Sequence, residues 1–338
     1  MITVTLFSRD NCHLCEQAKR DLESLQGEIP HRMVEVNIDG NRELLLAYGL
    51  EVPVVEVGPY RLKAPITRDD LKMTLGAAAD RAAHIKSIDG VNYGNRLQRG
   101  WTISSADRFT FWLSNHYMAL FNIFVLLYVG LPVLAPFLMA IGWFTPARFI
   151  YRVYGSVCHQ FAFRSWFVFG DQPAYPRAAA GVEGLITYGQ ATGLDEADIW
   201  AAREFIGNSI MGFKVALCQR DVAIYGGILV FGLIFSLTGR RLKSLPWYLW
   251  IIIGIIPIGL DGISQIISQP PLNSILPLGL LPFRESTPLL RTVTGVLFGV
   301  TTAWFGYPLV EESMIDTRQF LASKIARMKG AISQPVKS

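Results

Sequence analysis

Apolar residues are spread unevenly along the 338-residue chain, and their spacing changes near residue 118. Before that point, apolar runs of strand length alternate with segments in which apolar residues recur at helical spacing. Beyond it, the apolar runs 118–141, 222–237, 245–260 and 292–305 contain no charged residue. A helix of about 20 apolar residues crosses a bilayer. The pattern therefore predicts an N-terminal α/β domain followed by an all-α membrane domain with four transmembrane helices.

Residues 1–80 form the predicted α/β domain, with the element order βαβαββα. The strands are expected at 2–7, 32–39, 52–57 and 60–63, and the helices at 12–25, at 42–48 and from 67 onward. Thr67 is the expected N-cap of the last helix, and Asp70 holds the position from which an acidic side chain completes a capping box. The domain is predicted to end at residue 80, after this last helix has begun.

Residues 118–310 hold the predicted transmembrane domain, with spans expected at 118–141, 222–237, 247–267 and 288–309. The segment 147–160 includes Arg148, Arg152 and His159 and is too polar to span, so we interpret it as a helix lying in the membrane interface. A polar insert follows at 171–213, with one helix expected near Asp195.

Two basic segments flank the transmembrane domain. A juxtamembrane connector is predicted at 81–117, and its basic residues are Arg81, Lys86, Arg96, Arg99 and Arg108. A basic amphipathic tail is predicted at 311–338, with Arg318, Lys324, Arg327 and Lys329. We interpret this tail as an anchor on anionic lipid.

Composition agrees with a membrane protein and gives an orientation. Hydrophobic residues make up 51% of the chain and charged residues 17%, compared with about 25% charged in ordinary soluble domains. Lys and Arg cluster before the first span, between the second and third, and after the fourth, so both termini are expected in the cytosol and the spans in the cytoplasmic membrane. The N-terminal run has no signal-peptide pattern, which agrees with a cytosolic N-terminal domain. The net charge is only +4, and no nucleic-acid partner is expected.

Two of the four cysteines form a Cys-x-x-Cys motif at the start of the first predicted helix. Backbone N–H groups and the helix dipole stabilise a thiolate at such a position. Cys12 is therefore the expected nucleophile and Cys15 the resolving thiol. Pro53, after Val52, is the expected cis proline whose neighbouring backbone pairs with a substrate peptide. A structural metal half-site is the alternative, but no second Cys-x-x-Cys motif accompanies this one.

The run from Phe7 to Cys15, together with Val52-Pro53, resembles glutaredoxins and glutaredoxin-like proteins of the thioredoxin fold. The resemblance implies thiol–disulfide exchange with a protein or small-thiol partner. His13-Leu14 stands where the family usually has a proline within the motif. The family's Gly-Gly pair for glutathione is absent where Lys63-Ala64-Pro65 stands, so glutathione use does not carry over.

The polar residues of the membrane half fall on the side opposite the predicted cytosolic termini. The candidate site residues there are Cys158, His159, Gln160, Arg164, Cys218, Arg220, Asp221, Asp261, Gln265, Glu285 and Arg291, with Arg284 and Ser286 beside them. Ionisable residues within or next to spans are functional-site candidates. In this order the motifs resemble an uncharacterised family of prokaryotic membrane proteins over residues 145–305, a resemblance that brings no activity with it.

Three interpretations of this outer site compete. In the first, Cys158 and Cys218 form a second redox pair that serves a membrane or extracytoplasmic partner. In the second, Cys158, His159, Cys218 and Asp221 bind zinc, since thiolate and imidazole ligands suit this metal. The chain would then be a zinc-dependent membrane enzyme whose arginines hold a lipid or another anionic substrate. In the third, the cysteines form a static disulfide beside a buried ion-pair network, in a non-catalytic membrane scaffold subunit.

We favour a membrane-bound thiol–disulfide oxidoreductase. A direct relay from Cys12 and Cys15 to the outer cysteines would have to cross about 30 Å of hydrocarbon, and no cysteine lies in between. A quinone-like carrier or a larger membrane complex would therefore have to link the two sites, unless each acts on its own substrate.

Overall fold

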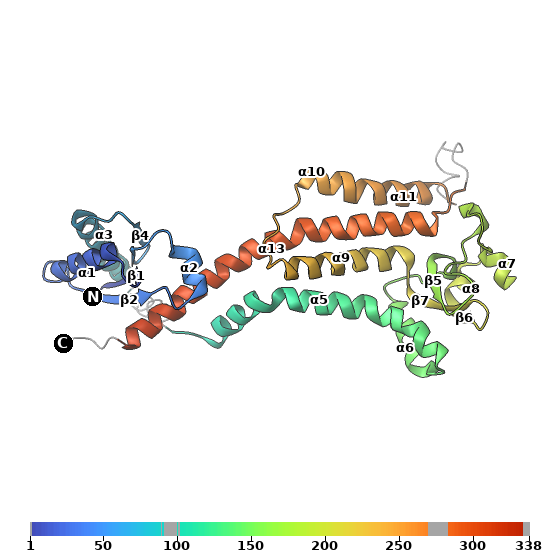
Figure 1. Ribbon diagram of the computed structural model, residues 1–338, viewed down its shortest axis with the longest axis horizontal. Helices are drawn as coiled ribbons and strands as arrows, with labels where there is room; N and C mark the ends of the chain where they lie inside the picture. The colour runs from blue at the N-terminus through green and yellow to red at the C-terminus, as the bar shows by residue number, and fades with distance from the viewer. Residues whose placement is uncertain (1, 89, 91–99, 101, 270–282, 334–338) are drawn as a thin grey trace. The chain divides into compact units, whose positions relative to one another are not determined.

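The computed structural model describes residues 2–88, 90, 100, 102–269 and 283–333. The chain divides into two compact units (Figure 1), and each is taken by itself below. Unit 1 comprises Met1–His116 with Glu312–Ser338, and unit 2 comprises Tyr117–Glu311. The N-terminal domain and the tail, which the sequence separates, therefore belong to one unit.

Unit 1 is built on a four-stranded sheet with the order β2-β1-β3-β4. Its strands are β1 (Ile2–Ser8), β2 (His31–Asn37), β3 (Val54–Val57) and β4 (Tyr60–Lys63). Strand β1 runs parallel to β2 and antiparallel to β3, which is antiparallel to β4. The helices are α1 (His13–Leu25), α2 (Arg42–Tyr48) and α3 (Arg68–Ile88). The predicted βαβαββα order is confirmed.

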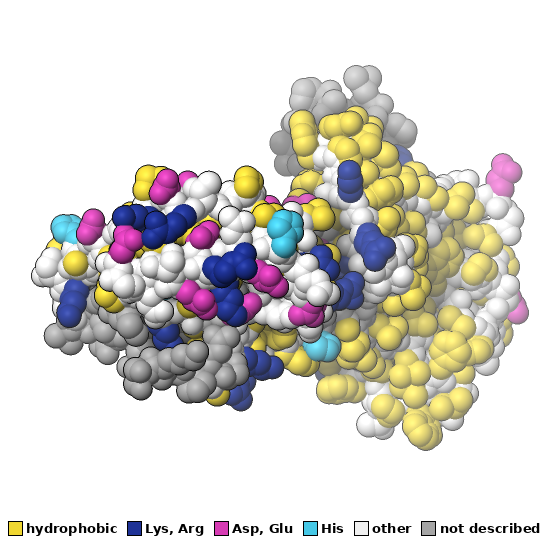
Figure 2. Space-filling view, turned by 60° about the vertical axis from the view of Figure 1, so that its left-hand side comes forward, with side chains coloured by type: hydrophobic (Ala, Val, Ile, Leu, Met, Phe, Trp, Pro, Cys, Tyr) yellow, Lys and Arg dark blue, Asp and Glu magenta, His cyan; other side chains and the backbone are white. Residues whose placement is uncertain are grey.

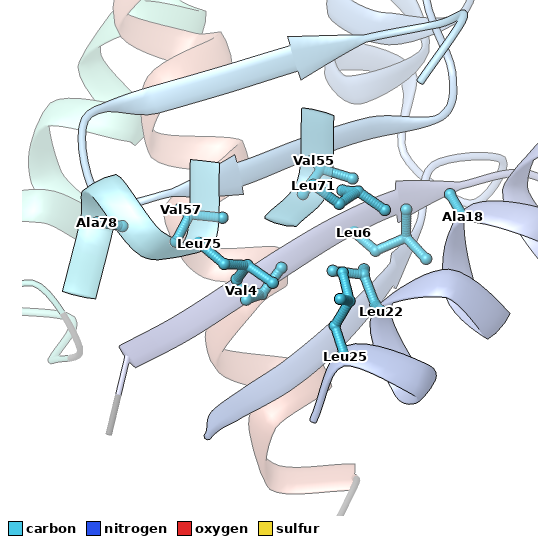
Figure 3. Packing of buried hydrophobic residues seen from close by; sticks show 10 residues of the cluster. All are labelled: Val4, Leu6, Ala18, Leu22, Leu25, Val55, Val57, Leu71, Leu75 and Ala78. Atoms are coloured by element: carbon cyan, nitrogen blue, oxygen red, sulfur yellow. The ribbon is translucent and has the colours of Figure 1, made fainter. Parts of the chain in front are cut away.

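One face of this sheet packs against α1 and α3. Val4 and Leu6 alternate along β1 with residues that face the other side of the sheet, and they meet Leu22 of α1 and Leu75 of α3 (Figure 3). Thr67 and Asp70 form the predicted cap of α3, because Asp70 Oδ2 accepts hydrogen bonds from the Thr67 backbone N–H at 3.0 Å and from its hydroxyl at 2.6 Å. The spacing of apolar residues in β1, α1 and α3 and the Thr67–Asp70 cap, all of them local sequence features, thus account for this side of unit 1.

The other face of the sheet is covered by α2 and by the last part of α13 (Pro288–Ser333). Ala322 of α13 is 1% exposed and packs with Phe7 and Val34 of the sheet. Arg318 donates to the Ser114 carbonyl at 2.7 Å, and Lys324 pairs with Asp107 at 2.8 Å.

Arg327 of the same helix pairs with Glu56 at 3.3 Å. The basic tail that we interpreted as a lipid anchor is thus a helix whose apolar face completes a protein core. Of the four basic side chains that we assigned to lipid, Arg318, Lys324 and Arg327 have protein partners instead.

The predicted connector is helical at both of its ends. Helix α3 continues through Ile88, and α5 (Ser105–Ala140) begins well before the apolar run. Ser104 and Asp107 cap α5, since Asp107 Oδ2 accepts from the Ser104 backbone N–H at 2.9 Å. Hydropathy located the first membrane span, but the polar cap formed by Ser104 and Asp107 determines where α5 begins. Arg96 and Arg99, and most of the loop predicted at 268–287, lie outside the described residues.

Unit 2 contains the apolar helices. Among the described residues, four helices are long and apolar enough to cross a membrane. They are α5, α9 (Gln219–Leu237), the continuous helix formed by α10 (Trp247–Leu249), η3 (Trp250–Ile255) and α11 (Ile256–Ile267), and α13. Phe121, Phe124 and Leu127 of α5 and Val230 and Leu233 of α9 are exposed. Figure 2 shows hydrophobic side chains over the helices of unit 2 and mixed charges over unit 1. The four predicted spans are confirmed, and their apolar surface suits contact with lipid.

A small α/β layer joins the ends of these helices. It contains α6 (Phe144–Tyr154), η1 (Ala162–Arg164), β5 (Ser165–Val168), η2 (Ala178–Ala180), α7 (Tyr188–Thr192), α8 (Ile199–Glu204), β6 (Gly207–Asn208) and β7 (Gly212–Cys218). The strand order is β5-β7-β6. Asp198, not Asp195, caps a helix, and Thr187 with Gln190 forms a capping box on another. Strand β7 runs straight into α9, a joint that positions the site described next.

Candidate functional site

The Cys12–Cys15 pair lies at the start of α1 and forms a disulfide. Cys12 is the N-cap and half-buried, whereas Cys15 is 4% exposed. The Cys15 backbone N–H donates to Cys12 Sγ at 3.2 Å. In the dithiol form, this N–H and the helix dipole favour a thiolate at Cys12. The exposure difference makes Cys12 the sulfur that a partner can reach.

The loop before the motif is held by a carboxylate on the neighbouring strand end. Asp39 accepts the Asp10 backbone N–H at 2.9 Å and pairs with Arg9 at 2.8 Å. These two contacts, the backbone bond first, lower the pKa of Asp39. Asn11 has a φ of 57°, a left-handed conformation that asparagine tolerates. The Val52–Pro53 peptide bond is cis, as expected.

A second pair of cysteines lies in unit 2 together with an acid. Cys158 Sγ, Cys218 Sγ and a carboxylate oxygen of Asp221 lie within 4.8 Å of one another, and both cysteines are free. The Cys218 thiol donates to Asp221 Oδ2 at 3.0 Å. The interaction between the two neighbouring sulfur atoms lowers the pKa of Cys158 and, together with burial, raises the pKa of Cys218. Cys158 is therefore the sulfur that ionises first.

The end of α6 places Cys158 against β7. The helix ends at Tyr154, and the turn at 155–157 carries the chain out of it. Gln160, at a φ of 54°, then donates through Nε2 to the Tyr151 carbonyl at 3.0 Å and the Ala216 carbonyl at 2.9 Å. This side chain ties the end of α6 to β7, and with it Cys158 to Cys218.

His159 does not join the thiols. Its side chain is exposed, and its ring lies 5.3 Å from that of Phe161. Cys158 and His159 are successive residues, so their side chains leave the backbone in different directions. Of the four predicted zinc ligands, the structure thus brings together Cys158, Cys218 and Asp221.

Lys214 is a member of the site that the sequence analysis missed. It lies in β7 with no exposed surface, and its Nζ donates to the Gln160 carbonyl at 2.7 Å and the Arg203 carbonyl at 2.6 Å. Burial lowers its pKa to about 7, while Cys158 acts in the opposite direction. A lysine within the otherwise apolar run from Phe213 to Leu217 was the available signal. Its charge lies where it can stabilise a Cys158 thiolate.

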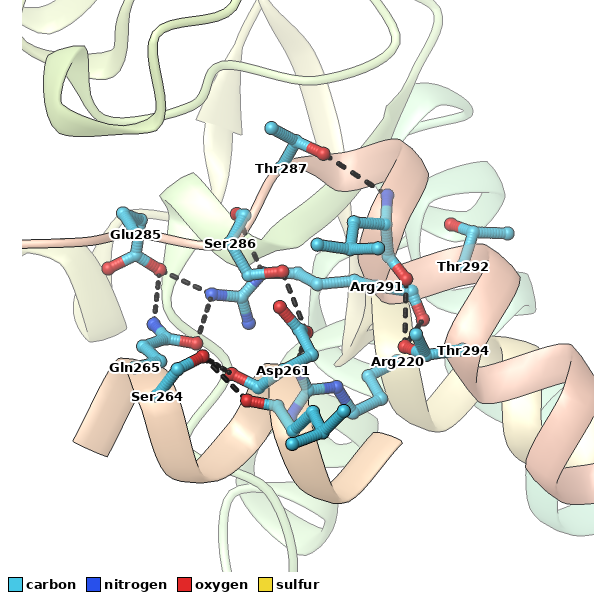
Figure 4. A network of polar contacts seen from close by, with 12 residues as sticks. Arg220, Asp261, Ser264, Gln265, Glu285, Ser286, Thr287, Arg291, Thr292 and Thr294 are labelled. Carbon is cyan, nitrogen blue, oxygen red and sulfur yellow. Dashed lines mark hydrogen bonds and ion pairs between the residues drawn. The ribbon is translucent and has the colours of Figure 1, made fainter. Parts of the chain in front are cut away.

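A polar network is built around two buried carboxylates, Glu285 and Asp261 (Figure 4). Glu285, 4% exposed, accepts two hydrogen bonds from Arg164, at 2.8 and 2.9 Å, and one from Gln265 at 2.8 Å. Arg291 also pairs with it, and Arg177 approaches it to 3.5 Å. The glutamate is therefore shared by three guanidinium groups.

Asp261 is the second carboxylate of the network and is also 4% exposed. It pairs with Arg220 and, at 2.9 Å, with Arg284, and it accepts the Ser286 hydroxyl at 2.8 Å. Asp261 and Gln265 share a face of α11, as their spacing predicts. In Figure 4 the Arg291 guanidinium lies between Glu285 and Gln265, whose Oε1 it reaches at 3.2 Å.

The structure thus brings together the candidate residues of the membrane half, except His159. Gln160 contributes by linking the end of α6 to β7. The thiols and the network share two segments, because Ser165 pairs with Cys218 across the sheet and Gln219 donates to the Ser165 carbonyl at 3.1 Å. Arg177 is the network residue that the sequence analysis missed. It stacks over the Phe163 ring at 3.8 Å, a tertiary contact for which the irregular insert carries no periodic signal.

Comparison with known families accounts for both units. Residues 3–76 match the family described as Glutaredoxin-like domain (DUF836). Unit 1 carries a glutaredoxin-like domain. Residues 203–305 match a family described as Predicted membrane protein (DUF2085). The chain therefore joins a glutaredoxin-like domain to a membrane domain with four apolar helices.

The second match covers Cys218, Asp261, Glu285 and Arg291, and begins after the segment with Cys158. An uncharacterised protein of Methanocaldococcus jannaschii is 25% identical over 209 residues, which are 59% of this chain and 96% of that protein. No solved structure matches the chain. The comparisons thus support a glutaredoxin-like domain on a membrane protein and bring no assigned activity for the membrane half.

Proposed function

We propose that the protein is a membrane-bound thiol–disulfide oxidoreductase. The observation that carries this proposal is the Cys12–Cys15 disulfide at the N-terminus of α1 in a glutaredoxin-like domain. In the dithiol form, the Cys12 thiolate attacks a partner's disulfide, and one partner sulfur leaves as a thiolate. The Cys15 thiolate then attacks Cys12 Sγ and releases the second partner sulfur. Two electrons pass to the partner, whose sulfurs take up two protons, and the domain is left as the disulfide.

Cys158 and Cys218 form the second redox pair of this proposal. Cys158, with the lowered pKa and Lys214 near it, is the attacking thiolate, and Cys218 closes the disulfide. Asp221 accepts a hydrogen bond from the Cys218 thiol and is placed to take its proton as that bond closes. Two electrons and two protons leave with the partner, either a disulfide or a quinone-like carrier.

The charge distribution supports an orientation for these two pairs. With four spans and Lys and Arg concentrated next to the glutaredoxin-like domain, after the second span and after the fourth, both termini lie in the cytosol. Cys12 then serves a cytosolic protein or small thiol, and Cys158 a membrane or extracytoplasmic partner. The two pairs act on separate substrates unless a carrier in the bilayer links them.

Zinc binding is a second candidate for the outer pair, favoured by the proximity of two thiols and a carboxylate. Cys158, Cys218 and Asp221 would supply three ligands, and a water or substrate the fourth. The site then resembles an open zinc centre in its donor set, although His159 is not part of it.

Thiol trapping in cells tests the redox proposal. With Cys15→Ser, the mixed disulfide at Cys12 cannot be resolved, so a partner stays covalently attached on a non-reducing gel. Cys12→Ser is the matched control and should capture nothing. The proposal fails if Cys15→Ser captures no partner and the wild-type Cys12–Cys15 pair keeps one redox state under both oxidant and reductant.

Metal analysis of the same preparations separates the two candidates for the outer site. A Cys158–Cys218 disulfide that forms and reverses with added oxidant and reductant supports the redox pair. One equivalent of zinc in the wild type, lost in both Cys158→Ser and Cys218→Ser, would instead establish the metal site.

A further inference from the structure

The network beside the thiols contains more positive than negative charge. Its guanidinium groups belong to Arg164, Arg177, Arg220, Arg284 and Arg291, which we call the arginine cluster. Within the described residues, these five side chains make ion pairs with only two carboxylates, Asp261 and Glu285. Residues 270–282, which follow α11, contain no charged residue in the sequence. Three positive charges of the cluster are therefore not neutralised by its own carboxylates.

Two guanidinium groups of the cluster are buried. Arg177 and Arg291 are 8% and 4% exposed, and a guanidinium does not lose its proton in a protein. Keeping such charges out of water requires partners. The Nε atoms of Arg177 and Arg220 are buried and have no hydrogen-bond partner in the part of the chain that the structure describes. Arg177 reaches Glu285 only at 3.5 Å, the longest ion pair of the cluster.

Three guanidinium groups of the cluster are partly exposed, and the cluster lies among helix ends. The side chains of Arg164, Arg220 and Arg284 are 22%, 20% and 37% exposed, so a ligand can approach them from solvent. Arg220 lies in the first turn of α9 and Arg291 in the first turn of α13. The positive ends of two long helix dipoles thus point to the same region. In a membrane, the ends of spanning helices lie at the depth of lipid headgroups.

We propose that the arginine cluster binds a phosphate group, supplied either by a phospholipid headgroup or by free phosphate. Guanidinium groups bind phosphate through paired hydrogen bonds. A phosphate offers several acceptor oxygens to the unused N–H groups and one or two negative charges against the surplus. The ligand enters at the exposed Arg284 and Arg220 side and reaches Arg177 from there. This inference does not depend on the redox proposal.

Two binding experiments on the full-length protein in an uncharged detergent distinguish the sources. The first measures phosphorus that remains with the purified protein and is removed by organic extraction, which reports a lipid headgroup. The second titrates the extracted protein with inorganic phosphate by calorimetry, with chloride at equal ionic strength as the reference. The proposal expects stoichiometric phosphorus in the first or saturable phosphate binding in the second. It is overturned if the wild type shows neither.

Three variants locate the bound phosphate. Arg177→Gln removes the buried guanidinium and Arg284→Gln the most exposed one, and each should weaken binding about tenfold or more, since each loses a charged hydrogen-bond donor. Arg148→Gln, an exposed arginine on α6, is the matched control and should bind like the wild type. Equal weakening in all three variants, or in none, contradicts a site at the cluster. Monodisperse elution of each variant shows that it is folded, and Arg284→Gln carries the test if Arg177→Gln is not.

Discussion

At the scale of single residues, Lys214 has the least ordinary environment of the outer site. Its ammonium group replaces water with two backbone carbonyls, and these belong to separate segments on either side of β7. The lysine therefore joins the segment of Cys158 to the end of α8 through a charge buried in protein. Since burial lowers the pKa of this group to about 7, its protonation changes within the range in which thiols also react.

The lowered pKa of Lys214 predicts a pH dependence of stability. Unfolded lysine has a pKa of about 10.4, so between pH 7 and pH 10 the unfolded chain binds a proton that the folded chain does not. Stability therefore rises with pH in this window, and Lys214→Met abolishes that contribution. The melting temperature of the wild type minus that of Lys214→Met should increase from pH 7 to pH 9. The same difference for the exposed Lys86→Met should stay flat; a flat or falling difference for Lys214→Met would contradict the prediction.

Residue-level features of the site were predictable only where they broke a regular pattern. Asp261 and Arg291 could be singled out because each interrupts or borders an apolar run. Arg177 could not, because its importance comes from Phe163 and Glu285, which no local pattern connects to it. His159 lies apart from the two thiols because the side chains of successive residues leave the backbone in different directions.

At the scale of elements, hydrophobic periodicity was sufficient for the strands and helices of unit 1 and for the four spans. The strands and helices of unit 1 bury one face, and the spans carry a continuous apolar surface. Both leave a pattern that can be recognised within a short stretch of sequence. The strands β5 and β7 escaped prediction because their pairing is decided between distant segments, and β6 escaped it because a strand of two residues carries no alternation. The extension of α13 into unit 1 also escaped it, since an amphipathic helix suits lipid and protein equally well.

The packing of α13 in unit 1 leads to a prediction. Ala322 is 1% exposed within the cluster of Phe7 and Val34, so Ala322→Glu places a carboxylate without a partner in a core. Such a change destabilises by roughly 2–5 kcal/mol. Limited proteolysis should cleave the glutaredoxin-like domain of this variant faster than that of the wild type. Phe320→Glu, two residues away and 64% exposed, is the control. Equal protease resistance of the two variants would show that this face of α13 does not support the domain.

At the scale of the whole molecule, the proposed orientation places the two redox pairs on opposite sides of the membrane. Single cysteines introduced into a variant that lacks the four native ones test this. Glu183→Cys, an exposed site in the insert, should react with an impermeant maleimide in intact cells. Glu23→Cys, exposed on α1, should react only after permeabilisation. Labelling of both sites, or of Glu23→Cys alone, in intact cells would refute the orientation.

The joint between β7 and α9 has a consequence for the chemistry of the outer pair. Cys218 is both the last residue of β7 and the N-cap of α9, so no linker separates its thiol from a membrane span. Cys158 is held on the strand side of this joint, because the Gln160 side chain ties its segment to the end of α6 and to Ala216 of β7. Spanning helices tilt to match the thickness of the hydrocarbon around them. We therefore expect a thinner or thicker bilayer to change how closely the two sulfur atoms approach, and with it how readily they bond to each other.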